Sequence, residues 1–182
     1  MHSQGSIIST DNSLDLAIDG TGMFQVLLPS GELVYTRNGA FSRNDEGLLT
    51  TSSGFIIQPE IAVPAEATKI NVSADGIISV QIPEQVEAQE VGQLQLANFQ
   101  NLTGLQPIGE NFYVESIASG PPILENPFVA GFGKIVQGSL EASNVNVVQE
   151  LVDMIETQRA YEVNSKAITS VDEMLRFVSN NL

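Results

Sequence analysis

The sequence predicts a mainly β protein with a long C-terminal α-helix: a hairpin-rich β domain followed by a coiled-coil-type terminal helix. Three observations lead to this class. Short apolar runs separated by turn residues fill most of the chain. An Asp75-Gly76 dipeptide stands between two of these runs. From residue 145 to the end there is neither glycine nor proline. We therefore expect a β domain over residues 1–142 and a helix over residues 143–182.

The first third of the chain predicts strands joined by tight turns. Phe24, Val26 and Leu28 recur at a period of two, which is typical of a half-buried strand. A Pro-Ser-Gly turn at 29–31 leads into the returning arm of a hairpin, because proline favours the first central position of a turn. A second turn is expected at 44–47. The strands expected here cover residues 14–18, 24–28, 33–36, 48–51 and 54–58.

The middle of the chain continues the hairpin pattern. Asp75-Gly76 between apolar runs is a strong hairpin signal, since both residues tolerate positive φ. The flanking strands are expected at 69–73 and 77–82. Leu94 and Leu96 alternate with glutamines before Phe99. Residues 100–135 are rich in glycine and proline, and we interpret them as loops around a few short strands.

The last forty residues predict a helix with an apolar seam. Ser143 or Asn144 can cap its start. Mostly apolar residues follow at alternating steps of four and three, with one three-residue slip before Val171. The mean repeat is near 3.5, which is the seam of a coiled coil. A helix of about 36 residues would be roughly 54 Å long. The seam residues that we expect to contact another subunit are Val147, Leu151, Met154, Gln158, Tyr161, Ile168, Val171, Leu175 and Val178.

This seam requires a partner. Most of the stability of a helix in a protein comes from packing, and no other segment of the chain shows a matching helical repeat. The partner is then another chain, or a segment that this sequence does not contain. The alternative is that the helix folds back along the β domain, although its length exceeds the diameter of such a domain.

The composition argues against several classes of function. Seven basic and 22 acidic residues give a net charge of −15, which disfavours binding to nucleic acid or to anionic lipid. No stretch approaches the roughly 20 apolar residues that span a bilayer, and no secretory signal precedes the first strand. We therefore expect neither nucleic-acid binding nor membrane insertion.

The residue types that catalysis needs are also scarce. The chain has no cysteine, and its one histidine is His2, close to the terminus. Nucleophile–histidine schemes and zinc sites thus lack a credible base or ligand set. We predict no catalytic residue, no cofactor and no metal site, and hence a protein that is not an enzyme.

Four segments, in this order along the chain, resemble the motifs of the bacterial flagellar rod and hook axial protein family. Within the family, residues 165–168 and 172–175 resemble the distal-rod branch most, and the proximal-rod and hook branches are looser fits. The family has a long N-terminal helix ahead of the first motif, so we interpret the chain as N-terminally truncated. The four segments are residues 14–26 (LDLAIDGTGMFQV), 35–41 (YTRNGAF), 137–145 (QGSLEASNV) and 154–162 (MIETQRAYE).

The resemblance implies a function as well as a fold. It implies a structural subunit of the flagellar distal rod that assembles with copies of itself into a helical homo-oligomer and transmits torque from the motor to the hook. The implied partners are other rod proteins, the hook protein and the bushing rings around the rod. The implied location is the flagellar basal body, spanning the periplasm after export by the flagellar type III apparatus, which needs no cleaved signal.

Two alternatives stay open at this point. The first is a proximal-rod or hook paralogue of the same family. The second, from a different class, is a secreted sugar-binding β domain in which the terminal helix is an oligomerising stalk.

Overall fold

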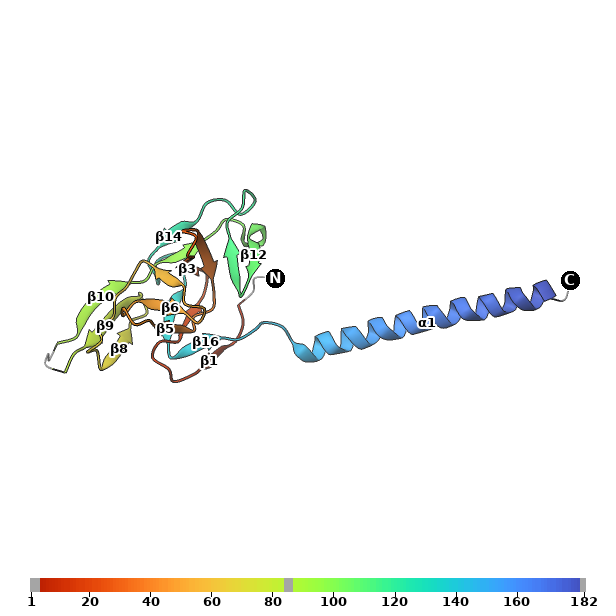
Figure 1. Cartoon of the computed structure of the whole chain (residues 1–182), viewed down its shortest axis with the longest axis horizontal. Helices are drawn as coiled ribbons and strands as arrows, with labels where there is room; N and C mark the ends of the chain where they lie inside the picture. Colours follow the sequence, from red (N-terminus) through yellow and green to blue (C-terminus); the bar gives the residue numbers. More distant parts are fainter. Residues whose placement is uncertain (1–3, 84–86, 181–182) are drawn as a thin grey trace. The chain divides into compact units, whose positions relative to one another are not determined.

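The computed structural model describes residues 4–83 and 87–180, with side chains described as far as Arg176. The chain folds into two compact units, Met1–Ser143 and Asn144–Leu182. In the described residues the first unit holds all the strands and the second a single helix (Figure 1). The predicted fold class, mainly β with a long C-terminal helix, is confirmed.

The largest sheet of the first unit is antiparallel and is centred on β3. Its main path runs β12-β13-β4-β3-β7-β6-β5, and β11 pairs with both β3 and β14. The expected hairpin at residues 24–36 is present as β3 and β4, with Val26 opposite Val34. The strands of this sheet are β3 (Met23–Leu27), β4 (Leu33–Thr36), β5 (Phe41–Arg43), β6 (Leu49–Thr51), β7 (Ile56–Gln58), β11 (Leu96–Asn98), β12 (Gln106–Gly109), β13 (Phe112–Val114) and β14 (Ile123–Glu125).

Three smaller antiparallel groups complete the unit. The Asp75-Gly76 hairpin is confirmed: Gly76 takes a positive φ of 80° and donates its amide to the Ser73 carbonyl at 2.9 Å. A short 3-10 helix lies at Leu102–Gly104. The groups are β8 (Lys69–Val72) with β9 (Ile77–Gln81) and β10 (Gln89–Gln93), β2 (Leu16–Asp19) with β15 (Lys134–Gln137), and β1 (Ile7–Ser9) with β16 (Ser139–Glu141).

The strand predicted at residues 24–28 is present as β3, but the prediction that it is half-buried is wrong. Met23, Phe24, Gln25 and Val26 are all buried, because apolar residues cover both faces of β3. Phe24 meets the Phe41 ring edge-on, with centroids 4.9 Å apart. Alternation in the sequence identified the strand but not the second layer of side chains that covers it.

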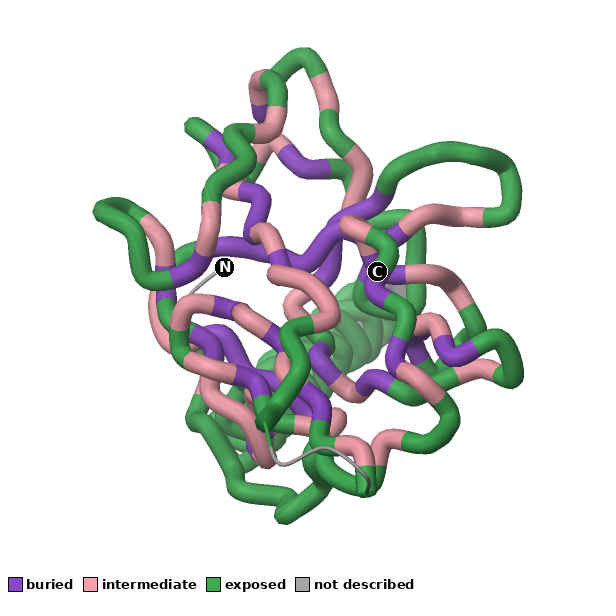
Figure 2. Tube along the Cα trace, turned by 90° about the vertical axis from the view of Figure 1, so that its left-hand side faces the viewer, coloured by how far each residue is buried: buried purple, intermediate pink, exposed green. Residues whose placement is uncertain are grey.

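The core of the first unit consists of three clusters of buried residues. The largest gathers side chains from β2, β3, β5 to β9, β11 and β15. Figure 2 shows that the buried positions lie in the β-rich unit, whereas the helix is exposed. The second joins Met23 and Tyr35 to Ala97, Phe99 and Leu105. The third surrounds Val26, Val34 and Phe112. Each fully buried large side chain contributes about 1.5–3 kcal/mol.

We predict that Tyr35 makes the stability of this unit sensitive to alkaline pH. Burial first, and then the charge of Glu115, raise the pKa of Tyr35 above its ordinary value of 10.0, against a hydrogen bond with Gln25 that lowers it. The unfolded chain then loses its tyrosyl proton at a lower pH than the folded chain. Stability is therefore full below about pH 10 and falls above it.

Urea unfolding followed by circular dichroism between pH 8 and 11 measures this effect. Tyr35→Phe removes the ionisable hydroxyl and keeps the ring that meets Phe99 edge-on. The variant should lose less stability with rising pH than the parent. Identical pH profiles for the two proteins would contradict the assignment.

Candidate assembly interface

The helix α1 (Val147–Asn180) begins with an asparagine cap. The side-chain oxygen of Asn146 accepts the amides of Val148 at 3.1 Å and Gln149 at 3.3 Å, which satisfies two of the free donors of the first turn. Ser143 and Asn144, predicted to cap the helix, lie ahead of it. The correction follows from where the helix begins: with its first turn at 147–150, the residue that reaches the free amides is Asn146.

The predicted seam residues lie on an exposed stripe of α1. At 100° per residue, the five from Val147 to Tyr161 fall within an arc of about 80°. The later ones, from Ile168 to Leu175, continue that stripe round the helix in one direction, as a 3.5-residue repeat does on a straight helix. Gln158 is also exposed. Val178 belongs to α1, but its side chain lies outside the described residues. The exposed fractions of the apolar seam residues run from 49% to 77%, for Val147, Leu151, Met154, Tyr161, Ile168, Val171 and Leu175.

A second apolar row on α1 was missed by the sequence-based prediction. Val148, Val152 and Ile155 are 69%, 43% and 49% exposed, and they lie about 100° round the helix from the seam. The signal was present, because these residues repeat the four-and-three spacing one position later. They lie outside the single heptad line that predicts the seam. Together the two rows give the first turns of α1 an apolar arc of about 160°, wider than one helical partner needs.

The chain enters and leaves the first unit at the same point. Strands β1 and β16 are antiparallel, with Ile7 opposite Glu141. Beyond this pair, the Ala142 amide donates to the Ser6 carbonyl at 2.8 Å. The segment that leads to α1 therefore departs beside the N-terminal segment, at one end of the two-stranded ribbon.

An arginine holds this end of the ribbon to the body of the unit. The Nε of Arg37 donates to Oε2 of Glu141 at 2.7 Å. Its terminal nitrogens donate to the carbonyls of Ile18, Gly20 and Gly22, at 3.2, 3.1 and 2.9 Å. The Arg37 and Glu141 side chains are 24% and 11% exposed. Charge-assisted bonds in such partial burial are stronger than those of a solvated pair.

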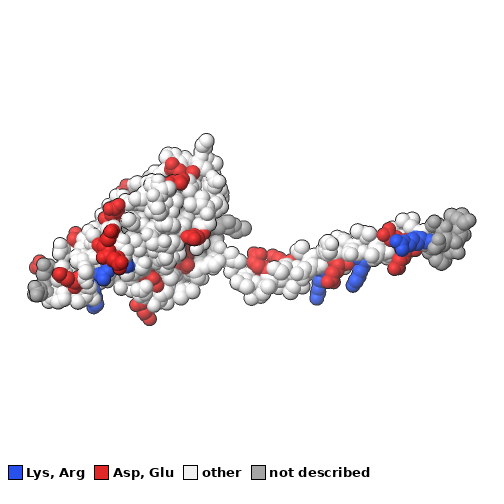
Figure 3. Space-filling view, viewed as in Figure 1, with Lys and Arg blue, Asp and Glu red and all other residues white. Residues whose placement is uncertain are grey.

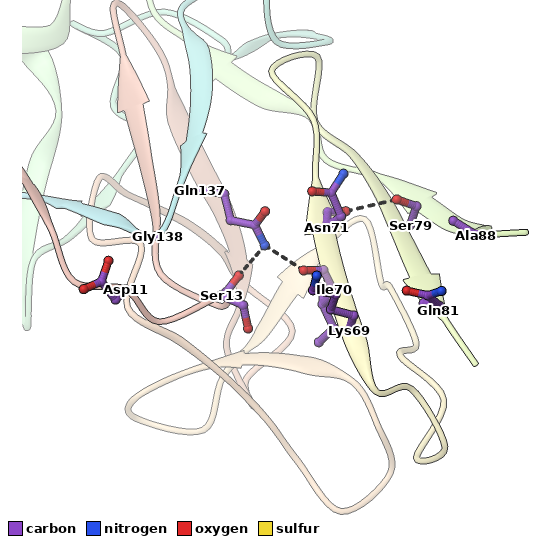
Figure 4. Close-up of a pocket in the computed structure, with 10 residues that line it drawn as sticks. All are labelled: Asp11, Ser13, Lys69, Ile70, Asn71, Ser79, Gln81, Ala88, Gln137 and Gly138. Atoms are coloured by element: carbon purple, nitrogen blue, oxygen red, sulfur yellow. Dashed lines mark hydrogen bonds between the residues drawn. The ribbon is translucent and has the colours of Figure 1, made fainter. Parts of the chain in front are cut away.

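Figure 4 shows a polar groove beside β8 in which Gln137 joins separate elements. Its side-chain nitrogen donates to the carbonyls of Ser13 at 2.8 Å and Ile70 at 2.9 Å, and its oxygen accepts the Val72 amide at 3.1 Å. The groove has a volume of about 590 Å³. Gln137 thus ties the β8–β9–β10 sheet to β15, and it occupies part of the exposed edge of β8.

The charged side chains lie spread over the surface. In the face seen in Figure 3, carboxylates are scattered over the first unit with a few basic groups among them, and the helix also carries both signs. No group of three or more potential metal ligands occurs among the described residues. Within the same part of the chain, no helix has the length and hydropathy needed to cross a bilayer.

The sequence of the chain matches the models of two known protein families. Residues 17–80 match the family described as "Flagellar hook protein FlgE/F/G D1 domain", and residues 136–182 match "Flagellar basal body rod FlgEFG protein C-terminal". The flagellar basal-body rod protein FlgG of Buchnera aphidicola subsp. Acyrthosiphon pisum is 51% identical over 98% of this chain and 69% of its own length.

Two relatives from one organism separate the branches of the family. FlgG of Caulobacter vibrioides is 48% identical over 97% of this chain and 67% of its own length. FlgF of the same bacterium, also a basal-body rod protein, is 34% identical over 95% of this chain and 67% of its own length.

The chain belongs to the FlgE/F/G family of flagellar basal-body rod and hook proteins. Within that family it follows FlgG, so it is a structural subunit of the flagellar distal rod. The family consists of structural proteins that assemble with other rod and hook components in the basal body. The resemblance seen in the sequence motifs is confirmed, and the sugar-binding alternative is not favoured.

We predict that Asn146→Ala frays the start of α1. Removing a cap of this kind costs about 1 kcal/mol of helix stability, so the amides of Val148 and Gln149 should exchange with solvent faster. Hydrogen exchange read by NMR measures them directly. Asn146→Asp keeps an acceptor at the cap and is the control. Equal protection in the parent and in Asn146→Ala would refute the cap.

Proposed function

We propose that α1 is the element through which this subunit polymerises, and that its seam packs against helices of neighbouring subunits to form a helical homo-oligomer. The observation that supports this is the exposure of every described side chain of α1, residues 147–176, including its apolar rows. An isolated helix of this kind is marginally stable, and burial of the apolar rows is the main source of stability open to it.

The first unit is proposed as the outer, load-bearing body of the subunit. Its three clusters form a core without any residue of α1, so the unit can keep its shape whether α1 is free or packed against other subunits. Repeated contacts between such bodies and their helices would stiffen a tube. The proposed task is to carry torque from the motor to the hook, in contact with other rod proteins, the hook protein and the surrounding bushing rings.

The remaining parts of the proposal concern location and chemistry. We propose that the subunit reaches the basal body through the flagellar type III apparatus and spans the periplasm there. We also propose that it is not an enzyme and needs no cofactor or metal. The membership of a family of structural rod proteins supports both statements.

We predict that an acidic residue in the seam blocks polymerisation and leaves the first unit intact. Leu151→Asp places a charge where apolar contact is needed, and burying an unpaired charge is strongly unfavourable. Sedimentation of the full-length protein should show loss of polymers, with unchanged NMR signals from the β unit.

Matched controls separate the seam from the helix as a whole. Ala160→Asp adds the same charge about 180° round α1 from Leu151, at an exposed position off the seam. For a second seam site, Ile168→Asp, the control is Ser170→Asp, about 160° away. The control variants should polymerise better than the seam variants. Normal assembly of Leu151→Asp and Ile168→Asp would remove the seam from the interface.

The proposed role is tested in cells by deleting the gene. Basal bodies purified from the deletion strain should end before the distal rod in electron micrographs, and the strain should be non-motile. The full-length gene should restore both. Complete basal bodies in a motile deletion strain would overturn the role.

A further inference from the structure

The β1–β16 ribbon has an end that a pulling force would open first. The chain enters near Gly5 and leaves at Ala142 on the same side of the Ile7–Glu141 pair. A force that separates the two segments therefore loads the Ala142–Ser6 bond first and the strand pairs afterwards, one at a time. Hydrogen bonds that are loaded singly resist less than bonds that are loaded together. The ribbon would be the weak point of the chain's anchorage unless something closes that end.

The Glu141 carboxylate closes it. One oxygen accepts the Gly5 amide at 2.8 Å, and the other accepts Nε of Arg37 at 2.7 Å. The carboxylate thus links the entering segment, the leaving strand and the body of the unit. Gln4 adds to the hold on the entering segment: its side chain donates to the Ile18 carbonyl at 3.2 Å and accepts the Gly20 amide at 3.1 Å.

Arg37 connects this closure to the centre of the fold. Its terminal nitrogens bind carbonyls at the end of β2 and in the turn into β3, the strand that is buried on both faces. The planar fork of arginine can reach three carbonyls and a carboxylate together, which the single ammonium of lysine cannot do. Arg37 thus donates three hydrogen bonds to main-chain carbonyls in addition to its bond with Glu141.

We propose that Arg37 and Glu141 form a latch that positions the segments at which the chain enters and leaves the first unit, and that directs load from the segment after Ala142 into the β2–β3 body instead of into the opening ribbon. Arg37 is a positioning residue in this role. The latch goes beyond the polymerisation of α1. It is a property of the first unit alone, so it can be tested without assembly.

Hydrogen exchange on the intact chain tests the latch at single amides. In Arg37→Ala and in Glu141→Gln, the Gly5 and Ala142 amides should exchange at least about tenfold faster, as expected when a bond to a charged group is lost. The amides of Phe24 and Val26 should be unchanged. Arg37→Lys should recover only part of the protection.

The other ion pair between described residues is the matched control. Lys134 and Asp19 lie 3.2 Å apart on the paired strands β15 and β2, with side chains 46% and 44% exposed. Lys134→Ala should leave the Gly5 and Ala142 amides unchanged. Equal exchange at those amides in Arg37→Ala and Lys134→Ala would overturn the latch. If Arg37→Ala does not fold, Glu141→Gln and Arg37→Lys carry the comparison.

A pulling experiment measures the mechanical role directly. Because the chain has no cysteine, His2→Cys and Gln149→Cys give two unique sites for handles. Pulling between them separates β1 from β16, starting at the end of the ribbon where Gly5 and Ala142 lie. The first rupture force should fall in Arg37→Ala and in Glu141→Gln, and it should stay the same in Lys134→Ala. An unchanged first rupture force in the two latch variants would show that the pair bears no load.

Discussion

Burial of β3 on both faces is the constraint on which the first unit depends. The strand pairs with β4, β7 and β11, and its side chains contribute to all three clusters of the core. The turn that leads into it must approach other backbone closely: a Cβ on Gly20 would lie 2.7 Å from the Cα of Gly133. That turn then presents the carbonyls of Gly20 and Gly22 to Arg37. The central strand therefore fixes the place where Arg37 binds Glu141, beside the segments at which the chain enters and leaves the unit.

The second unit differs from the first in that its helix is exposed. Its helix has good local signals, namely the Asn146 cap, Glu150 in the first turn and no glycine or proline, yet none of its described side chains is buried. Local signals define where it begins, and packing has to come from outside. One subunit thus combines a body that has its own core with a helix whose described side chains are all exposed, a combination that suits the proposed polymerisation through α1.

Much of this could be predicted from the sequence, for identifiable reasons. The hairpins around residues 31, 47 and 76 were found because glycine marks each turn. The helix was found because its apolar spacing differs from the period of two in the strands. The double burial of β3 was missed, since its cover comes from residues such as Phe99 and Leu105, far away in the sequence. The contacts of Arg37 were missed for the same reason, although it lies inside a motif. Its partner Glu141 is 104 residues away.

The two apolar rows of α1 have a kinetic consequence. In the proposed assembly, α1 of a free subunit would be only marginally stable, and a pair of free subunits would offer each helix only one surface. The end of an existing polymer would offer a preformed surface to both rows at once. Elongation at an existing end is thereby favoured over spontaneous nucleation, because the nucleus meets the ordering entropy before most contacts exist. Subunits with such helices would grow where a template already stands and would start new filaments rarely.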